Sequence, residues 1–517
     1  MPSIGEFRAG ALAVLLGAAA LAACSDGSET TTSPTTGTTT GTPTGGGGST
    51  EVGGSGGTGA AGGTTVSTGG GGAGGATTTS STSTSTGTGG GGPACGAFAQ
   101  RHGGTTLQDE ARIAGAVVDA SGGAIVAGEI VGSVKVGAQT MVSAGGADAL
   151  VLRLSEGGSI AWAKRIGSIY DDRVKGVAAL PDGGAVLVGT FDGVVDFGGE
   201  TLTSIAGPDA FVLRLDADGQ LAFVLQFVNA DARAVAIDDG GDILVTGDFM
   251  GMSTFGQIPL ASVGTDVFVA RISTAGDVLA AERFTFESKA GALAIAAGAG
   301  RTYLAGSFTG SVDFGTGPLA GAGSRDVFVA RLDGALAPVV VKRFGDDTSQ
   351  EARAVAVMPD GSAAIAGSFR GELDLDGTLL VADTQDDAFV ARLDEDGGVL
   401  FGLRFGDAAE QIARAITVDA GGGLLVAGGF HGTIDAGDGP VTSEGGEDVF
   451  LAWLDPMGTA VKTMRWGAAA DQRARAVSAD PCGAVVIGGD FTGTLPWDGE
   501  VLEATGALDA FVARVAP

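Results

Sequence analysis

The chain has 517 residues, 95 of them glycine, and a formal net charge of −31 from 60 acidic and 29 basic side chains. Four acids and one base precede residue 96, which leaves 56 acids and 28 bases in the rest of the chain. A surface this acidic repels phosphate backbones and anionic lipid head groups, so nucleic acid is excluded as an expected partner.

The N-terminus reads as a targeting segment. Residues 9–23 form an uncharged run rich in alanine and leucine, which is short for a membrane span and typical of a secretory signal. The run ends Leu21-Ala22-Ala23-Cys24, which resembles the lipobox of bacterial lipoproteins. The resemblance implies a signal peptide over residues 1–23 and lipidation of Cys24; the alternative is ordinary secretion with a free cysteine. We expect an exported protein anchored by lipid to the cell envelope, at the outer membrane or cell surface rather than the inner membrane.

Residues 24–94 are almost wholly glycine, serine and threonine. Such a segment buries too little apolar surface to offset the entropy of ordering it. We therefore predict a disordered linker between the anchor and a domain over residues 95–517.

The domain is built from one phrase copied seven times. The phrase, DAFVARL at residues 387–393, recurs at intervals of 57 to 61 residues, with its first residue at Asp148, Asp209, Asp266, Asp326, Asp387, Asp448 and Asp509. In the fifth copy, four apolar runs at residues 352–357, 363–369, 388–393 and 399–405 are separated by turn signals such as Pro359-Asp360-Gly361. Four short strands in each of seven copies predict an all-β, seven-bladed β-propeller of four-stranded antiparallel blades.

The ends of the chain predict how the ring closes. The last copy stops after its third strand, whereas residues 96–103 match the fourth strand of other copies, for example residues 399–406. The N-terminal strand should therefore complete the last blade and leave no exposed sheet edge. Cys95 precedes this strand and Cys482 lies in a hairpin turn of the same blade, so we predict a disulfide between them, with two free thiols as the alternative.

The order of these runs resembles the bacterial extracytoplasmic SBBP repeat, and more loosely the NHL repeat. The resemblance covers residues 96–517 and implies the fold. It implies no activity, because the family has no shared catalytic motif.

A ring of acids is the main candidate site. The blade-to-blade connections each carry at least one acid, and in a propeller these loops gather around one mouth of the channel. Such a ring suits a cation, calcium included, or a basic partner; the alternative is that these are ordinary polar loops. The candidate residues are Asp109, Glu110, Asp171, Asp172, Asp231, Glu287, Asp346, Asp347, Asp407, Glu410 and Asp471.

Other polar repeats favour structural roles. The seven aspartates of the repeated phrase are expected to accept backbone N–H groups, and the arginines that follow them to pair with a carboxylate or carbonyl. His102 and His431 form no catalytic group. Four Trp and two Tyr are few for a carbohydrate platform, and Trp497 and Tyr170 are the two aromatic residues to check for that role.

These observations favour a non-enzymatic binding or scaffolding module without a resident cofactor. We expect it to be monomeric and to bind an envelope protein or ligand. The first alternative is a hydrolase or lyase of the propeller kind, with carboxylates and calcium at the acidic mouth. The second is a structural spacer.

Overall fold

The computed structural model describes residues 96–205, 207–288, 290–291 and 293–516, which belong to one compact unit of the chain. Their regular structure consists of β-strands. Within these ranges we find no helix with the length and apolarity needed to span a bilayer. The expected signal peptide and linker, with Cys24 and Cys95, lie outside the described residues.

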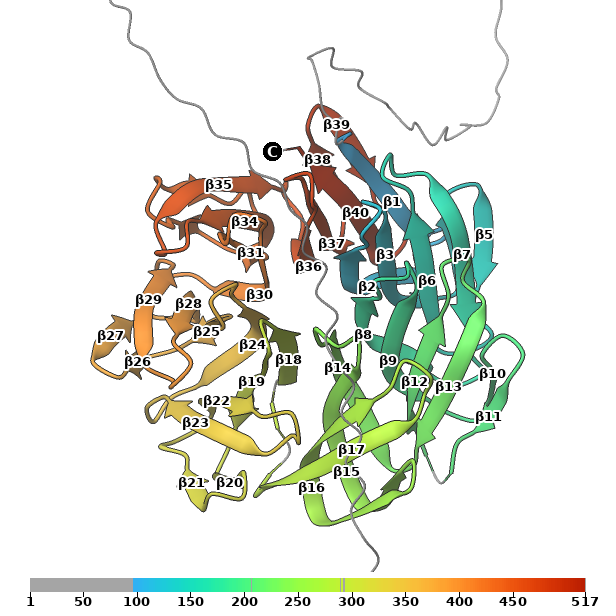
Figure 1. Ribbon diagram of the computed structural model, residues 1–517. Helices are drawn as coiled ribbons and strands as arrows, with labels where there is room; N and C mark the ends of the chain where they lie inside the picture. The colour runs from blue at the N-terminus through green and yellow to red at the C-terminus, as the bar shows by residue number, and fades with distance from the viewer. Residues whose placement is uncertain (1–95, 206, 289, 292, 517) are drawn as a thin grey trace, which may run out of the picture. The chain divides into compact units, whose positions relative to one another are not determined.

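Seven antiparallel blades surround a central axis and confirm the predicted propeller (Figure 1). The first strands of the blades are innermost: β2 (Glu110–Val118), β8 (Arg173–Ala179), β14 (Ala230–Ile237), β18 (Leu293–Gly298), β24 (Gln350–Val357), β30 (Gln411–Val418) and β36 (Gln472–Ala479). Neighbouring innermost strands contact one another around the whole ring. They therefore form the wall of the central channel.

The other three strands of each blade follow outward. The second strands are β3 (Ala124–Val131), β9 (Ala185–Phe191), β15 (Ile243–Phe255), β19 (Arg301–Phe308), β25 (Ala363–Phe369), β31 (Leu424–Phe430) and β37 (Val485–Phe491). The third strands are β6 (Asp148–Leu154), β12 (Asp209–Leu215), β16 (Ile258–Ile272), β22 (Asp326–Leu332), β28 (Asp387–Leu393), β34 (Asp448–Leu454) and β40 (Asp509–Val515). The fourth strands are β7 (Ile160–Ile166), β13 (Leu221–Phe227), β17 (Val278–Phe286), β23 (Pro338–Phe344), β29 (Val399–Phe405), β35 (Ala460–Trp466) and β1 (Phe98–Gly104).

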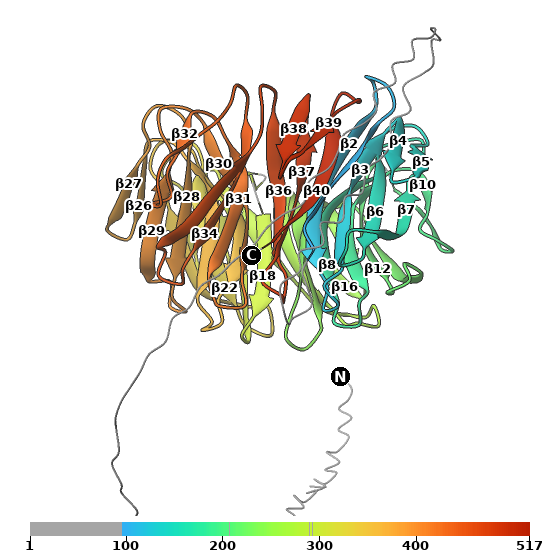
Figure 2. The same ribbon diagram turned by 90° about the horizontal axis from the view of Figure 1, so that it is seen from above.

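The extra length of each copy lies between the second and third strands, as the sequence indicates. In six blades it forms a separate short hairpin, and in the third blade β15 and β16 extend without a break. The hairpins are β4 (Ser133–Val136) with β5 (Gln139–Val142), β10 (Val194–Asp196) with β11 (Thr201–Thr203), β20 (Ser311–Asp313) with β21 (Pro318–Ala320), β26 (Glu372–Leu375) with β27 (Thr378–Val381), β32 (Thr433–Ile434) with β33 (Val441–Thr442), and β38 (Thr494–Trp497) with β39 (Glu500–Glu503). Figure 2 shows the blades from the side.

Ring closure also follows the prediction. Strand β1 joins the sheet β36-β37-β40 and pairs antiparallel with β40, from Phe98 opposite Arg514 to His102 opposite Ala510. Strand β1 thus completes the last blade, and the ring of blades is closed between the last blade and the first.

The core lies between blades. In β25 all seven residues are buried, because alternate side chains pack against different neighbours. Ala363 and Ile365 pack against Tyr303 of the preceding blade, whereas Ala364 packs against Leu424 of the following one. A strand covered on both faces needs a continuous run of small and apolar residues, which is the pattern that the repeats show.

The repeated aspartates hold each third strand to its surroundings, as expected. Asp326 is fully buried and accepts hydrogen bonds from the Ala322 N–H and the Arg343 guanidinium, both at 2.8 Å. Burial raises the pKa of Asp326, and these two donors oppose the shift. The role of this carboxylate is therefore structural.

The arginine of the same phrase links neighbouring blades. Arg153 pairs with Asp119 at 2.6 Å and donates to the carbonyl oxygens of Gly183 and Ala217, each at 2.8 Å. Both carbonyls belong to turns of the next blade. The expected carboxylate or carbonyl partner is confirmed.

Candidate functional site

Among the residues that the structure describes, the channel wall carries a β-bulge in six blades. The extra residue interrupts the ladder between the first and second strands, as Arg353 does between Ala352 and Ala354. A bulge leaves that residue outside the ladder and re-aims its side chain. The bulged residues are Ala114, Lys175, Arg233, Arg353, Arg414 and Arg475.

A glycine on the second strand makes room for the bulge. A Cβ on Gly367 would overlap the carbonyl oxygen of Glu351, and one on Gly428 would overlap that of Ile412. In the fourth blade, the described residues of β18 pair with β19 in regular register from Leu293 opposite Gly306. The bulge positions and Leu293 together make one level of the channel, which carries five cations and two apolar residues.

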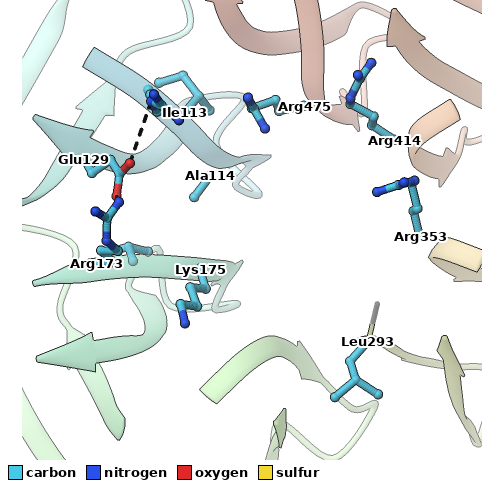
Figure 3. Close-up of a pocket in the computed structure, with 11 residues that line it drawn as sticks. Ile113, Ala114, Glu129, Arg173, Lys175, Leu293, Arg353, Arg414 and Arg475 are labelled. Carbon is cyan, nitrogen blue, oxygen red and sulfur yellow. Dashed lines mark hydrogen bonds and ion pairs between the residues drawn. The ribbon is translucent and has the colours of Figure 1, made fainter. Parts of the chain in front are cut away.

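All of these residues except Arg233 line a cavity of about 430 Å³. Six basic residues and one acid, Glu129, line it among the described residues; the basic ones are Arg112, Arg173, Lys175, Arg353, Arg414 and Arg475. Figure 3 shows the cations arranged around an open centre, with Leu293 on one side. Inside an acidic protein, this level of the channel is therefore lined mainly by positive side chains.

A second cavity of about 250 Å³ shares this level of the channel. Its wall continues along the innermost strands and includes Val177, Val235, Val355, Ile416 and Val477. The channel thus combines a basic level with an apolar wall.

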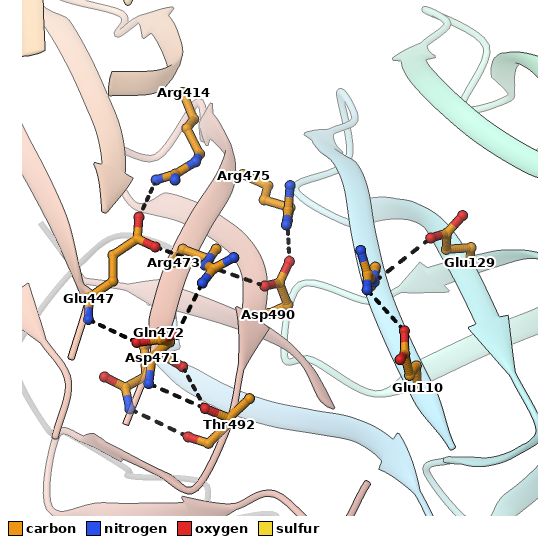
Figure 4. Close-up of polar contacts among 11 residues, drawn as sticks. Glu110, Glu129, Arg414, Glu447, Asp471, Gln472, Arg473, Arg475, Asp490 and Thr492 are labelled. Atoms are coloured by element: carbon orange, nitrogen blue, oxygen red, sulfur yellow. Dashed lines mark hydrogen bonds and ion pairs between the residues drawn. The ribbon is translucent and has the colours of Figure 1, made fainter. Parts of the chain in front are cut away.

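Carboxylates next to the cations hold them in place. Arg173 lies 2.5 Å from Glu129, and Arg414 lies 2.7 Å from Glu447. Arg475 pairs with Asp490, as Figure 4 shows. These pairs orient the guanidinium groups without closing the cavity.

Burial affects the arginines on the fifth and sixth blades. It lowers the pKa of Arg353, and the charges of Asp386 and Glu410 oppose that shift. Burial also lowers the pKa of Arg414, and the charge of Glu447 opposes that shift. Both groups therefore hold positive charge where it is poorly solvated.

The predicted acids lie at the same end of the blades as this cavity, but many of them accept hydrogen bonds from the connecting loops. Asp109 is buried and accepts hydrogen bonds from the N–H groups of Thr106 at 2.6 Å and of Thr105 and Ser133 at 2.9 Å. Burial would raise its pKa, but these donors lower it to about 2. Asp172 is also buried and accepts the N–H groups of Ser168 and Asp192, and burial raises its pKa.

Other predicted acids accept backbone N–H groups or pair with arginine and lysine. Asp346 accepts the N–H groups of Thr348 and Glu372, and Asp407 those of Ala409 and Thr433. Ion pairs join Glu110 to Arg112, Asp171 to Arg173, Asp231 to Lys175 and Asp471 to Arg473. Glu287 and Asp347 are exposed, and Glu410 is partly buried.

No group of three or more His, Cys, Asp or Glu among the described residues is arranged to hold a metal ion. Binding of a cation or basic partner at the acidic ring stays a prediction. Cys482 lies in the turn before β37, and its bond to Cys95 stays a prediction because Cys95 is not described.

The two aromatic candidates differ in exposure. Trp497 is 3% exposed and stacks on Trp466, with ring centroids 4.3 Å apart, so it belongs to the core. Tyr170 is 52% exposed. His102 is buried, and no hydrogen-bond partner of either ring nitrogen is described.

The basic level is not predicted when each copy of the repeat is considered by itself. Its signal is a cation at the same place in the first strand of five copies, within runs such as ARAVAV at residues 352–357. Alternation alone does not predict which way such a residue points, because a bulge changes the alternation.

The strand order and the lined channel define a seven-bladed β-propeller. No protein-family model matches the chain, and a search of curated proteins finds no match, so the resemblance to the SBBP repeat is not confirmed.

Solved structures with a similar arrangement include a protein of unknown function from Bacteroides caccae, with 11% identity, 61% of this chain and 89% of that chain covered, and a TM-score of 0.32. The Dos1 propeller has 8% identity, 80% and 93% coverage and a TM-score of 0.39. The C-terminal WD40 domain of Sif2 has 10% identity, 80% and 100% coverage and a TM-score of 0.36.

Proposed function

We propose that the protein is a non-enzymatic binding module of the cell envelope, anchored by lipid at Cys24, and that its ligand occupies the central channel. The observation that carries this proposal is the cavity of about 430 Å³ with its converging charged side chains. Sites for small ligands typically measure about 300–1,000 Å³ and combine apolar walls with a few placed polar groups.

Binding is favoured over hydrolysis by the way the carboxylates are used. A general acid or base must face its substrate. Glu129 lines the cavity, but its carboxylate forms an ion pair with Arg173 at 2.5 Å. Most of the described connecting-loop acids accept N–H groups or pair with cations. They are spread over several blades and do not converge on one loop as the hydrolase or lyase alternative requires.

A substitution that fills the channel tests the proposal. Ala114 lines the cavity at a bulge, so Ala114→Trp should obstruct it. The matched control is Ala275→Trp at an exposed turn. Calorimetry on the full-length chain in detergent would use three panels: small anions, neutral oligosaccharides and polyamines.

We expect at least one panel to contain a ligand whose binding is lost in Ala114→Trp and kept in Ala275→Trp. Binding that survives in both variants would place the ligand elsewhere. Failure of all three panels to bind would contradict the proposal.

Anchoring is tested separately. Cys24→Ser should move the protein from the membrane fraction to the soluble exported fraction, and mass spectrometry should lose the acyl groups from the N-terminal peptide. Equal membrane association of both forms would contradict the lipid anchor.

A further inference from the structure

We propose that Arg353, Arg414 and Arg475 form an anion-binding arc in the channel, which takes an oxyanion with two or more negative charges, of the phosphoryl or polycarboxylate kind. The inference rests on the proposed function, because it assigns the ligand class of the same cavity.

The arc is built by repetition. Its three residues are the bulged residues of β24, β30 and β36, on three consecutive blades. All three line the cavity, and Figure 3 shows their side chains around the same open space. Three guanidinium groups are therefore held at one level by backbone geometry.

The three charges act on one another. Besides burial, the positive charges of Arg475 and Arg353 contribute to the lowered pKa of Arg414. An anion placed among them would replace this repulsion with attraction, and a doubly charged anion would do so more effectively than a singly charged one.

Hydrogen-bond donors remain available on the arc. A guanidinium has five N–H donors in a planar fork that matches carboxylate and phosphate oxygens. Side-chain exposure is 35% for Arg353, 18% for Arg414 and 32% for Arg475. The buried Nε of Arg353 has no described hydrogen-bond partner.

Each arginine of the arc has one carboxylate partner, Glu351, Glu447 or Asp490, and the cations on the opposite side of the same level are paired as well. Lys175 lies 2.5 Å from Asp231. Arg233 lies 2.5 Å from Asp248 and also donates to the carbonyl oxygen of Gly291 at 3.1 Å. The arc is thus the side on which three consecutive guanidinium groups line the cavity, whereas Arg233 is not among its lining residues.

The channel also limits the size and shape of the ligand. Leu293 and Ala114 interrupt the cationic level on either side, and valine and isoleucine side chains line the wall beyond it. These features favour a compact ligand with its charges gathered at one end. A long polyanion would also meet repulsion from the rest of a protein of net charge −31.

Calorimetry on the full-length chain at constant ionic strength tests the inference. Pyrophosphate is the phosphoryl probe, citrate is the polycarboxylate probe, and acetate is the singly charged control. Arg414→Gln removes the middle cation of the arc. Arg301→Gln is the matched control, because it removes an equally charged, half-exposed residue that pairs with Glu395 at 2.6 Å and does not line this cavity.

We expect pyrophosphate or citrate to bind at least tenfold more tightly than acetate. Arg414→Gln should weaken that binding at least tenfold, and Arg301→Gln should change it less than twofold. The stronger of the two probes identifies the chemical class. If Arg414→Gln fails to fold because Glu447 loses its partner, the double variant Arg414→Gln, Glu447→Gln removes both charges and should show the same loss.

Equal binding of acetate and citrate, or equal effects of the Arg414 and Arg301 variants, would overturn the inference. The inference would also be overturned if neither pyrophosphate nor citrate binds but a neutral or cationic ligand does, and if Ala114→Trp abolishes the binding of that ligand. The proposed function would then stand. If no ligand class binds, both fail.

Discussion

Arg101 and Asp509 join the first and last strands of the propeller: the Nε of Arg101 donates to Oδ2 of Asp509 at 2.5 Å, across 408 residues of sequence. Asp509 is fully buried and also accepts the N–H groups of Gly104 and Thr505, each at 2.9 Å. One carboxylate therefore fastens β1 to the sheet that it completes.

Removing that carboxylate should open the closure. Asp509→Ala removes the acceptor of the Arg101 Nε and of the Gly104, Thr505 and Gly506 N–H groups, and we expect it to lower the free energy of unfolding by about 3 kcal/mol. Urea unfolding followed by circular dichroism measures the loss. The control is Asp374→Ala, which removes an exposed acceptor of the Gly377 N–H and should cost under about 1 kcal/mol. Equal losses would contradict a special role for Asp509.

Acid should weaken the same strand through His102. Burial, together with the charge of Arg101, lowers the pKa of His102 from 6.5 to about 4. Between these values the unfolded chain binds a proton that the folded chain does not. Above pH 6.5, His102 therefore does not affect the stability. As the pH drops from 6.5 to 4, the free energy of unfolding falls by about 3 kcal/mol, and it changes no further through His102 below that.

The variant His102→Phe isolates this effect, because Phe405 occupies the equivalent place in the fifth blade. The stability gained over the unsubstituted protein should grow between pH 7 and pH 4, as measured by urea unfolding at each pH. A gain that does not depend on pH would show that His102 does not titrate in this way.

Trp497 should behave as a core residue. It stacks on Trp466 and lies 5.7 Å from the ring of Phe511, so Trp497→Ala should cost about 3–5 kcal/mol of unfolding free energy. Tyr170→Ala at the exposed position should cost under about 1 kcal/mol. Thermal and urea unfolding of the two variants compare them directly, and the reverse order would place Trp497 outside the core.

The predicted disulfide has a simple chemical test. Peptide mapping without reduction should yield a peptide pair linked through Cys95 and Cys482, which separates on reduction. Cys482→Ser should lower stability under oxidising conditions by up to about 5 kcal/mol, since the bond closes nearly the whole domain. Under reducing conditions Cys482→Ser and the unsubstituted protein should match. Two alkylated thiols in the unreduced protein would contradict the bond.

Much of the fold was predictable because each copy carries its own local signals. Strand β25 begins and ends where the apolar run of residues 363–369 predicts, and β24 starts two residues earlier than predicted, at Gln350. The pairing of β1 with β40 was also predictable, since a repeat that lacks its fourth strand must take one from elsewhere to avoid an open edge.

The site was predictable only in part. The position of the acids could be inferred from loop order, but Asp109 and Asp172 turned out to be buried acceptors of backbone N–H groups. That use depends on loop conformation, which composition does not specify. The cations were visible as repeats, but their convergence was not.

By itself, the sequence determined the number of blades, the strands within them and the way the ring closes, because these follow from repeat spacing, apolar runs and turn residues. Only the tertiary structure decided the charge of the channel. Arg353, Arg414 and Arg475 lie 61 residues apart along the chain, and they share one cavity because each bulge re-aims its side chain and the closed ring brings the innermost strands together.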